Sequence, residues 1–487
     1  MTDYDLVIRG GTVATASDVF AADVAVSGGT IAAIGSGLGR GRTEIDARGR
    51  FVLPGGVDSH THIEQMSSGG FVCSDTFETA TKAALMGGTT TTISFVAQGR
   101  GESVARNADA YHALARAGAV TDYAFHLILA DPTEEVLKGE LPELVAAGHS
   151  SLKLFMTYDR VKLDDLQILD VLETARELGA LVMAHAENHG MIEWLTRRLL
   201  DRGYTHARYH GVAHARAAEA EAFQRLIALA ELVDQPVMLY HVSTAEGAAI
   251  VRQARGRGLK VYAETCPQYL FLTRGDMDRP GNEAAKFVYS PPGREAADGD
   301  ALWAALAQGD LQLISSDHSP YAFDDTGKLR FSPTPNFKEI VSGMPGIEAR
   351  LPLLFDAMVA SGRFRLTDFV RWTASEPARL YGLAPQKGTI APGADADIAI
   401  WDADKEITFA DESVHDGARY TPYAGRTVRG WPVTTVRRGE VVVDDGRLLA
   451  AAGSGRFLAR AAGEAAMPLG RPSPEFDPAR NFGAVLR

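Results

Sequence analysis

The feature that most restricts the possible folds is an alternation of short apolar runs with amphipathic stretches between residues 51 and 316. The apolar runs cover residues 51–60, 90–95, 123–129, 151–156, 180–185, 237–241, 260–264 and 311–316. The stretches between them, such as residues 76–85, 164–178 and 217–232, place apolar residues at helical spacing. Strands that alternate with helices are typical of a parallel sheet built from βα units. Eight repeats predict an α/β fold with a TIM-like (β/α)8 barrel.

An open doubly wound sheet is the alternative for strands two to seven. A nucleotide-binding sheet of that kind has a Gly-x-Gly-x-x-Gly turn after its first strand, and no such turn follows residues 51–60. The barrel is therefore the favoured interpretation.

The two ends of the chain share a different pattern. Short β-rich runs with glycine turns, such as residues 6–8 before Gly10-Gly11, occupy the N-terminal region and recur in residues 396–401, 433–436 and 441–443. We expect one small β-sandwich domain built from both ends. The predicted boundaries are 1–53 and 385–455 for this domain, 54–384 for the catalytic barrel, and 456–487 for a C-terminal tail that is a candidate oligomer contact.

Composition excludes several classes of protein. With 46% hydrophobic residues and no apolar run near the ~20 residues that span a bilayer, we expect no membrane contact. A formal net charge of −13 argues against nucleic acid as a partner. Residues 1–5 lack the basic start of a signal peptide, and Cys73 and Cys266 are too few for a disulfide framework. These features predict a cytoplasmic protein.

Six polar side chains stand at or near the ends of predicted strands: His60, His62, Lys153, His185, His241 and Asp317. Taken alone, each is most simply a hydrogen-bonded loop residue or a lysine that reaches water. However, strands one, five, six and eight all end in residues of metal-ligand type, while strands two and three do not. Active sites of such barrels form at the C-terminal ends of the strands, so the coincidence favours one shared site.

The ligand types indicate a divalent cation. Four imidazoles and a carboxylate suit Zn²⁺, and Mn²⁺, Co²⁺ or Fe²⁺ would accept the same set. The ammonium group of Lys153 would be repelled by such ions, so this side chain must be displaced, neutral or converted to an anion. Conversion of the lysine to an anion fits best.

Five ordered motifs extend the pattern: His60-Thr61-His62 after residues 54–58, then residues 151–158, 185–188, 241–243 and 316–318. They resemble the motifs of the dihydropyrimidinase and D-hydantoinase group of the amidohydrolase superfamily, and the resemblance covers nearly the whole chain. It implies a hydrolase that opens a small cyclic amide with two divalent ions per subunit. It also implies that Lys153 is an N6-carboxylysine bridging both ions, that His60, His62 and Asp317 hold one, and that His185 and His241 hold the other. Relatives are commonly tetramers.

The resemblance also assigns roles in the reaction. Two cations lower the pKa of a shared water toward neutrality. Asp317 would carry the proton from that water to the leaving ring nitrogen. Tyr158 would donate its hydroxyl to the developing oxyanion, and Ser290 would orient the ring through its backbone.

Two places depart from the family pattern. Hydantoinases usually follow the His pair with a Leu-Asp-Met-Pro-Phe-like segment, where this chain has residues 63–67, and Ser342 stands where the family more often has an asparagine that contacts the substrate. Glu64 also stands where dihydroorotases have an arginine that binds the substrate carboxylate. We therefore expect both residues to affect substrate binding and the ring to be a neutral cyclic ureide or imide rather than dihydroorotate. A cyclic imide hydrolase, an allantoinase-like enzyme, an open-chain amidase or deaminase and a non-catalytic protein like the collapsin-response mediators are the alternatives.

Overall fold

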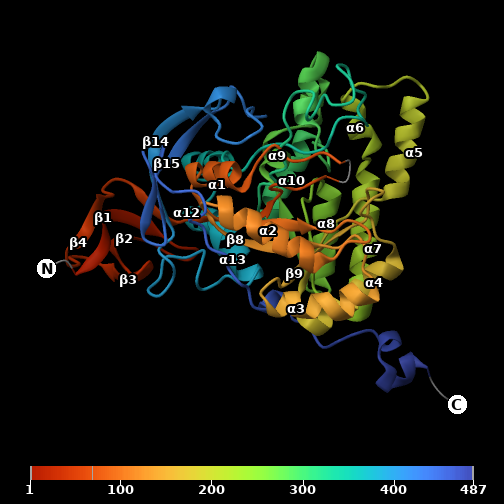
Figure 1. Ribbon diagram of the computed structural model, residues 1–487, viewed down its shortest axis with the longest axis horizontal. Coiled ribbons are helices and arrows are strands. Elements are labelled where there is room, and N and C mark those ends of the chain that lie inside the picture. The colour runs from red at the N-terminus through yellow and green to blue at the C-terminus, as the bar shows by residue number, and fades with distance from the viewer. Residues whose placement is uncertain (1–2, 68–69, 485–487) are drawn as a thin grey trace.

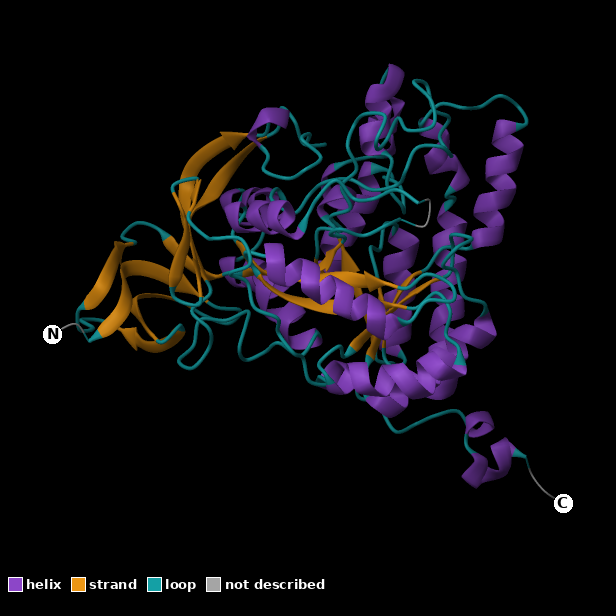
Figure 2. Cartoon of the chain, in the orientation of Figure 1, coloured by secondary structure: helices purple, strands orange, loops and turns teal. Residues whose placement is uncertain are grey.

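The computed structural model describes residues 3–67 and 70–484. It contains two sheets, which lie side by side in Figure 1: a mixed sheet beside the N-terminus and a curled parallel sheet surrounded by helices. In Figure 2 the helices surround the parallel sheet, while the mixed sheet stands outside this shell.

The parallel sheet is the predicted barrel. Its strands are β6 (Gly56–Thr61), β7 (Thr89–Ala97), β8 (Asp122–Ile128), β9 (Ser151–Phe155), β10 (Leu181–His185), β11 (Val237–Leu239), β12 (Val261–Thr265) and β13 (Leu313–Ile314). They neighbour one another in chain order from β6 to β13. A parallel bridge between Thr61 and His318, with the amide of His62 donating to the His318 carbonyl at 2.7 Å, joins the two edges. The expected barrel fold is confirmed.

Helices follow the strands where the sequence has capping signals. At α1 (Phe77–Met86), Thr76 and Thr79 form a capping box, and at α4 (Asp165–Leu178) Asp164 and Gln167 form another. The other α-helices are α2 (Val104–Gly118), α3 (Leu141–Ala146), α5 (His189–Leu200), α6 (Arg208–Ala213), α7 (Arg216–Val233), α8 (Ala245–Gly256), α9 (Pro267–Phe271), α10 (Ala296–Gln308), α11 (Arg350–Phe355), α12 (Leu366–Val370) and α13 (Glu376–Leu380).

The mixed sheet combines both ends of the chain, as expected. It contains β1 (Tyr4–Ala14), β2 (Val19–Ser27), β3 (Thr30–Gly35), β4 (Gly41–Asp46), β5 (Phe51–Pro54), β14 (Ile398–Thr408), β15 (Thr427–Arg437), β16 (Glu440–Asp444) and β17 (Arg447–Leu448). N-terminal β5 pairs with C-terminal β14, and residues such as Ile8, Val52, Ile398 and Val436 bury their side chains in one apolar cluster. This shared core holds the two ends together.

The predicted first strand, residues 51–60, is wrong as a single element. Residues of β5 pair in the mixed sheet, and the barrel strand β6 begins only at Gly56. The break falls at Gly55, where a Cβ atom would lie 2.2 Å from the Oγ1 of Thr90. Only glycine allows the chain to pass this close to β7 as it changes sheets.

Two other predicted strands are too long. β11 ends at Leu239 and β13 at Ile314, so His241 and Asp317 lie in the loops beyond their strands. The backbone leaves the sheet there because both residues adopt positive φ angles, 42° and 49°.

Part of the tail packs on its own barrel. The amide of Leu458 donates to the carbonyl of Tyr123, Arg460 is buried, and the amide of Arg471 donates to Asp234. The last turns extend away from the barrel in Figure 1. A subunit contact through this tail stays a prediction.

No helix in residues 3–67 and 70–484 is long and apolar enough to cross a membrane.

Candidate active site

One cavity of about 1030 Å³ opens among the loops that follow the barrel strands. All ten side chains that the sequence predicted for the site line this cavity: His60, His62, Glu64, Lys153, Tyr158, His185, His241, Ser290, Asp317 and Ser342. They come from loops and strand ends that are up to 282 residues apart in the sequence, from His60 to Ser342. The barrel therefore brings the predicted residues together.

Three of these side chains converge closely enough to hold one cation. The Oδ1 atom of Asp317 lies 3.1 Å from the Nε2 of His60 and 3.5 Å from the Nε2 of His62. One ligand atom from each of the three residues lies within 4.8 Å of the other two. Two imidazole nitrogens and a carboxylate oxygen are a ligand set that divalent zinc and its neighbours accept.

Acceptors on the far side of each ring fix the orientation of these histidines. The Nδ1 of His60 lies 2.5 Å from Glu264, and the Nδ1 of His62 lies 2.6 Å from the Oε1 of Gln65. On the neighbouring ring, the Nε2 of His185 lies 2.7 Å from Glu187. Such contacts leave the other ring nitrogen of each histidine facing the cavity, which is the arrangement found around metal-bound histidines.

No role was predicted for Glu264, Glu187 or Gln65 from the sequence, although Glu187 and Glu264 stand inside a quoted motif and a predicted strand. Glu187 could have been found, since it follows His185 by two residues at the end of an apolar strand. Glu264 is itself a buried polar residue in such a strand. Gln65 gave no signal, because its loop conformation brings it back to His62.

The remaining predicted ligands lie beside this cluster. The rings of His185 and His241 stand 4.4 Å apart between centroids, and the rings of His60 and His241 are 5.7 Å apart. The buried Nδ1 of His241 has no hydrogen-bond partner in the described parts of the chain. Burial lowers the pKa of His60, His185 and His241, so their imidazoles are neutral, the form that binds metals.

Lys153 lies at the centre of this group with only 1% of its surface exposed. Its Nζ atom is 3.9 Å from the centre of the Tyr240 ring, and no carboxylate in the described residues lies within ion-pair distance. Burial lowers the pKa of Lys153 to about 7, a shift that the charges of Asp317 and Glu264 only partly oppose. The surroundings therefore disfavour an ordinary ammonium group.

Four site residues have backbone conformations that are rare outside glycine. Glu64, Tyr158, His241 and Asp317 have φ angles of 49°, 71°, 42° and 49°. Such conformations cost about 1–3 kcal/mol each and occur most often at functional sites, where the fold imposes them. Here they turn the chain away from the strand direction so that the side chains line the cavity.

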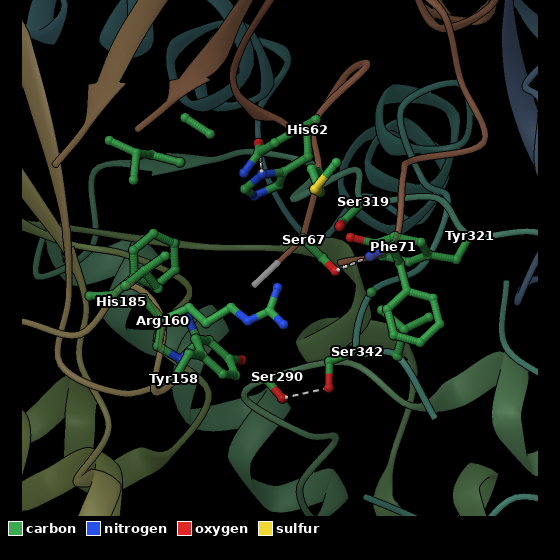
Figure 3. Close-up of a pocket in the computed structure, with 18 of the residues that line it drawn as sticks. His62, Ser67, Phe71, Tyr158, Arg160, His185, Ser290, Ser319, Tyr321 and Ser342 are labelled. Carbon is green, nitrogen blue, oxygen red and sulfur yellow. Dashed lines mark hydrogen bonds between the residues drawn. The ribbon is translucent and has the colours of Figure 1, made fainter. Parts of the chain in front are cut away.

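The predicted substrate contacts lie together on another part of the wall. In Figure 3 the Tyr158 ring and the hydroxyls of Ser290 and Ser342 line the same cavity, and the Ser290 hydroxyl donates to Ser342 over 3.2 Å. Burial raises the pKa of Tyr158, so its hydroxyl keeps the proton and can donate a hydrogen bond. The fold thus presents several hydroxyl groups to a polar ring.

Glu64 lines the cavity but already has a partner. Its Oε2 accepts a hydrogen bond from the amide of Phe77, the first residue of α1, at 3.1 Å. Burial raises the pKa of this carboxyl group, and the bond from Phe77 opposes that shift. The arginine that would bind the carboxylate of dihydroorotate is absent at this position, as the sequence indicated.

A parallel barrel with a His-His-Asp cluster, further histidines and a buried lysine at the ends of its strands defines a metal-dependent hydrolase of the barrel class. Comparison with known proteins identifies the family. The sequence profile described as "Amidohydrolase family" matches residues 51–442, so the chain belongs to the amidohydrolase family.

Named relatives match over almost their whole length. A D-hydantoinase of Ralstonia pickettii is 41% identical over 460 residues, which cover 94% of this chain and 99% of the relative. A D-hydantoinase of Streptomyces coelicolor is 43% identical and covers 93% of this chain and 98% of its own. The crystal structure of dihydropyrimidinase from Brevibacillus agri superimposes with a TM-score of 0.91 at 41% identity, covering 94% of this chain and 99% of that one.

Proposed function

We propose that this protein is a metal-dependent cyclic amidohydrolase that opens the ring amide of hydantoins, dihydropyrimidines or related cyclic ureides to give N-carbamoyl amino acids. One observation carries the proposal. All ten residues expected for such a site line a single cavity, with His60, His62 and Asp317 close enough to share a cation. Relatives that cover 94% of the chain and are named D-hydantoinase support the same reaction.

The proposed cofactor is a pair of divalent ions, with zinc as the first choice. His60, His62 and Asp317 would hold one ion and His185 and His241 the other, with Lys153 between them as an N6-carboxylysine. When bound, the ions make water a stronger nucleophile and polarise the carbonyl that is attacked. The neutral imidazoles and the acceptors Glu187 and Glu264 behind them fit this assignment.

The protein's own residues would orient the ring and move the proton. Asp317 accepts the proton of the attacking water and delivers it to the ring nitrogen that leaves. Tyr158 donates its hydroxyl to the oxygen on which negative charge develops. The backbone at Ser290 binds the ring amide, and Ser342 contacts the ring from the same wall.

The decisive experiment is a panel of cyclic amides with metal content measured on the same preparation. Hydantoin, dihydrouracil, succinimide and dihydroorotate are compared by kcat/KM at neutral pH. We expect turnover of hydantoin or dihydrouracil and about two metal ions per chain. Preference for succinimide would indicate a cyclic imide hydrolase, and preference for dihydroorotate would refute the assignment. A chain without metal or turnover would indicate a binding protein.

A variant tests the lysine. Lys153→Ala should lose most of its metal and activity, and a short carboxylic acid added to the buffer should restore part of both, because it can replace the missing carbamate. Full metal occupancy with near-normal turnover in Lys153→Ala would contradict the bridging role.

We also propose a cytoplasmic homotetramer. The buried thiols of Cys73 and Cys266 are free, which suits a reducing compartment. Light scattering on the purified chain measures the subunit number, and a truncation after residue 473 tests whether the tail contributes to assembly.

A further inference from the structure

The cavity wall carries a positive charge that the proposed chemistry does not use. Arg160 lies in the loop after β9, two residues beyond Tyr158, and its side chain lines the cavity. In Figure 3 its guanidinium group points into the open space between Ser67 and the Ser290 and Ser342 hydroxyls. Within the described parts of the chain it has no hydrogen-bond acceptor and no carboxylate partner.

A second arginine approaches the same place from the loop that follows β13. The Nη1 of Arg330 donates to the carbonyl of Gly70 at 3.0 Å, and its guanidinium group lies 5.1 Å from the centre of the Phe71 ring. The Nη1 of Arg160 lies 3.5 Å from the point where a Cβ atom of Gly70 would stand. Since both nitrogens approach one residue, they lie within roughly 10 Å of each other. No carboxylate in the described residues is paired with either.

The other charged groups on this wall are satisfied. Apart from the proposed metal ligands, the charged residues that line the cavity are Glu64, Arg100, Glu102, Asp159, Lys338 and Glu339, and each has a hydrogen bond or ion pair to the protein. Two guanidinium groups repel one another unless an anion lies between them or water screens them. Among the described residues that line the cavity, Arg160 is thus the cation that remains available to a ligand.

We propose that the cavity selects a cyclic ureide whose ring substituent ends in a carboxylate, which Arg160 binds while Arg330 adds positive potential. The inference rests on the proposed function and names its substrate class. A guanidinium group matches a carboxylate through two parallel hydrogen bonds. Arg160 is exposed, so a ligand in the cavity can reach its guanidinium group. An apolar or neutral substituent of the same length would leave Arg160 unpaired.

This substrate differs from dihydroorotate. There the carboxylate is attached directly to the ring, where the dihydroorotase arginine is replaced by Glu64. In the proposed substrate the ring is neutral, as the sequence predicted. A short chain attached to the ring ends in the carboxylate and places it beside Arg160. The anion is therefore bound beyond the ring, at the guanidinium group in the open part of the cavity.

The test uses two hydantoins of equal size, one with a 2-carboxyethyl and one with a 2-carbamoylethyl substituent. We expect the metal-loaded enzyme to favour the acid over the amide in kcat/KM by about 2- to 5-fold, the range for an exposed ion pair, and high salt to reduce this ratio. In Arg160→Gln the ratio should fall to about one, and in Arg160→Glu below one. Arg202→Gln, an exposed arginine beyond α5 that is not on the cavity wall, is the matched control and should keep the ratio.

A ratio near one in the parent enzyme, or an unchanged ratio in Arg160→Gln, would overturn the inference. Turnover of unsubstituted hydantoin is measured separately, since its absence counts against the proposed function. Calorimetric binding of N-carbamoylglutamate and N-carbamoylglutamine, the two ring-opened products, needs no turnover. Preference for the acid that disappears in Arg160→Gln would support the anion site even then, and equal binding would refute it.

Discussion

Lys387 is a charged group that joins the barrel to the mixed sheet, and its removal should weaken the contact between them. It is buried, and its Nζ atom lies 2.7 Å from Asp122, 2.9 Å from Asp395 and 2.8 Å from Asp397. Asp122 begins barrel strand β8, while Asp397 directly precedes β14 of the mixed sheet. Burial alone lowers the pKa of Lys387, but the charges of Asp397, Asp122 and Asp395 outweigh it and raise the pKa above its usual value.

Lys387→Met fills the space but removes the charge. Asp122 would keep its ion pair with Arg438, while Asp395 and Asp397 would lose the buried cation that they share. Breaking a buried ion pair by removing one partner costs about 3–5 kcal/mol. In the control Lys405→Met, the lost partner is Asp445, whose side chain is 85% exposed, so the cost should stay below about 1 kcal/mol.

Urea unfolding followed by tryptophan fluorescence measures the difference. Trp401 in β14, one of the five tryptophans of the chain, stacks on Phe355 of α11 with ring centroids 4.7 Å apart, so part of the emission reports contact between sheet and barrel. With a slope of roughly 3 kcal/mol/M, the midpoint should fall by about 1 M or more in Lys387→Met. The deficit should shrink at lower pH, because burial raises the pKa of Asp397 and the folded variant can take up a proton there. Equal midpoints for the two variants would refute this reasoning.

Three further perturbations are informative. Asp317→Asn should keep the fold and much of the metal but lose at least about 100-fold in kcat, because an amide cannot carry the proton; a loss of only a few-fold would show that another group does so. Lys328→Met removes a buried amino group that donates to the carbonyls of three residues beside the cavity, at positions 288, 341 and 343. It should destabilise the protein by about 3 kcal/mol or more and raise KM for the ring substrate, whereas an unchanged unfolding midpoint would contradict this. Burial and the neighbouring His112 lower the pKa of His149 to about 3. Between pH 6.5 and 3 the unfolded chain binds a proton there that the folded chain does not. Stability therefore decreases as the pH is lowered, by up to about 1.4 kcal/mol per pH unit. His149→Gln should lose about 2 kcal/mol less than the parent between pH 7 and 5, and an equal loss would show that His149 does not cause it.

The sequence by itself determined the type of fold and which side chains gather at one rim of the barrel. The βα repeats are visible because burial imposes a period of two on strands and 3.6 on helices, and those periods are local. The ligand types at strand ends were likewise visible, since parallel strands bring their C-terminal ends to one rim. His60, His62 and Asp317 could therefore be assigned to one place without coordinates.

Only the tertiary structure decided how those residues are held and what surrounds them. Contacts between segments distant in sequence decide three features: the change of sheet at Gly55, the positive φ angles of His241 and Asp317, and the surroundings of Arg160 in the cavity wall. Glu264 stands 204 residues from the histidine that it orients. Local periodicity contains no information on such contacts, because they arise when the closed barrel brings the loops together and packing imposes backbone conformations that the isolated chain disfavours.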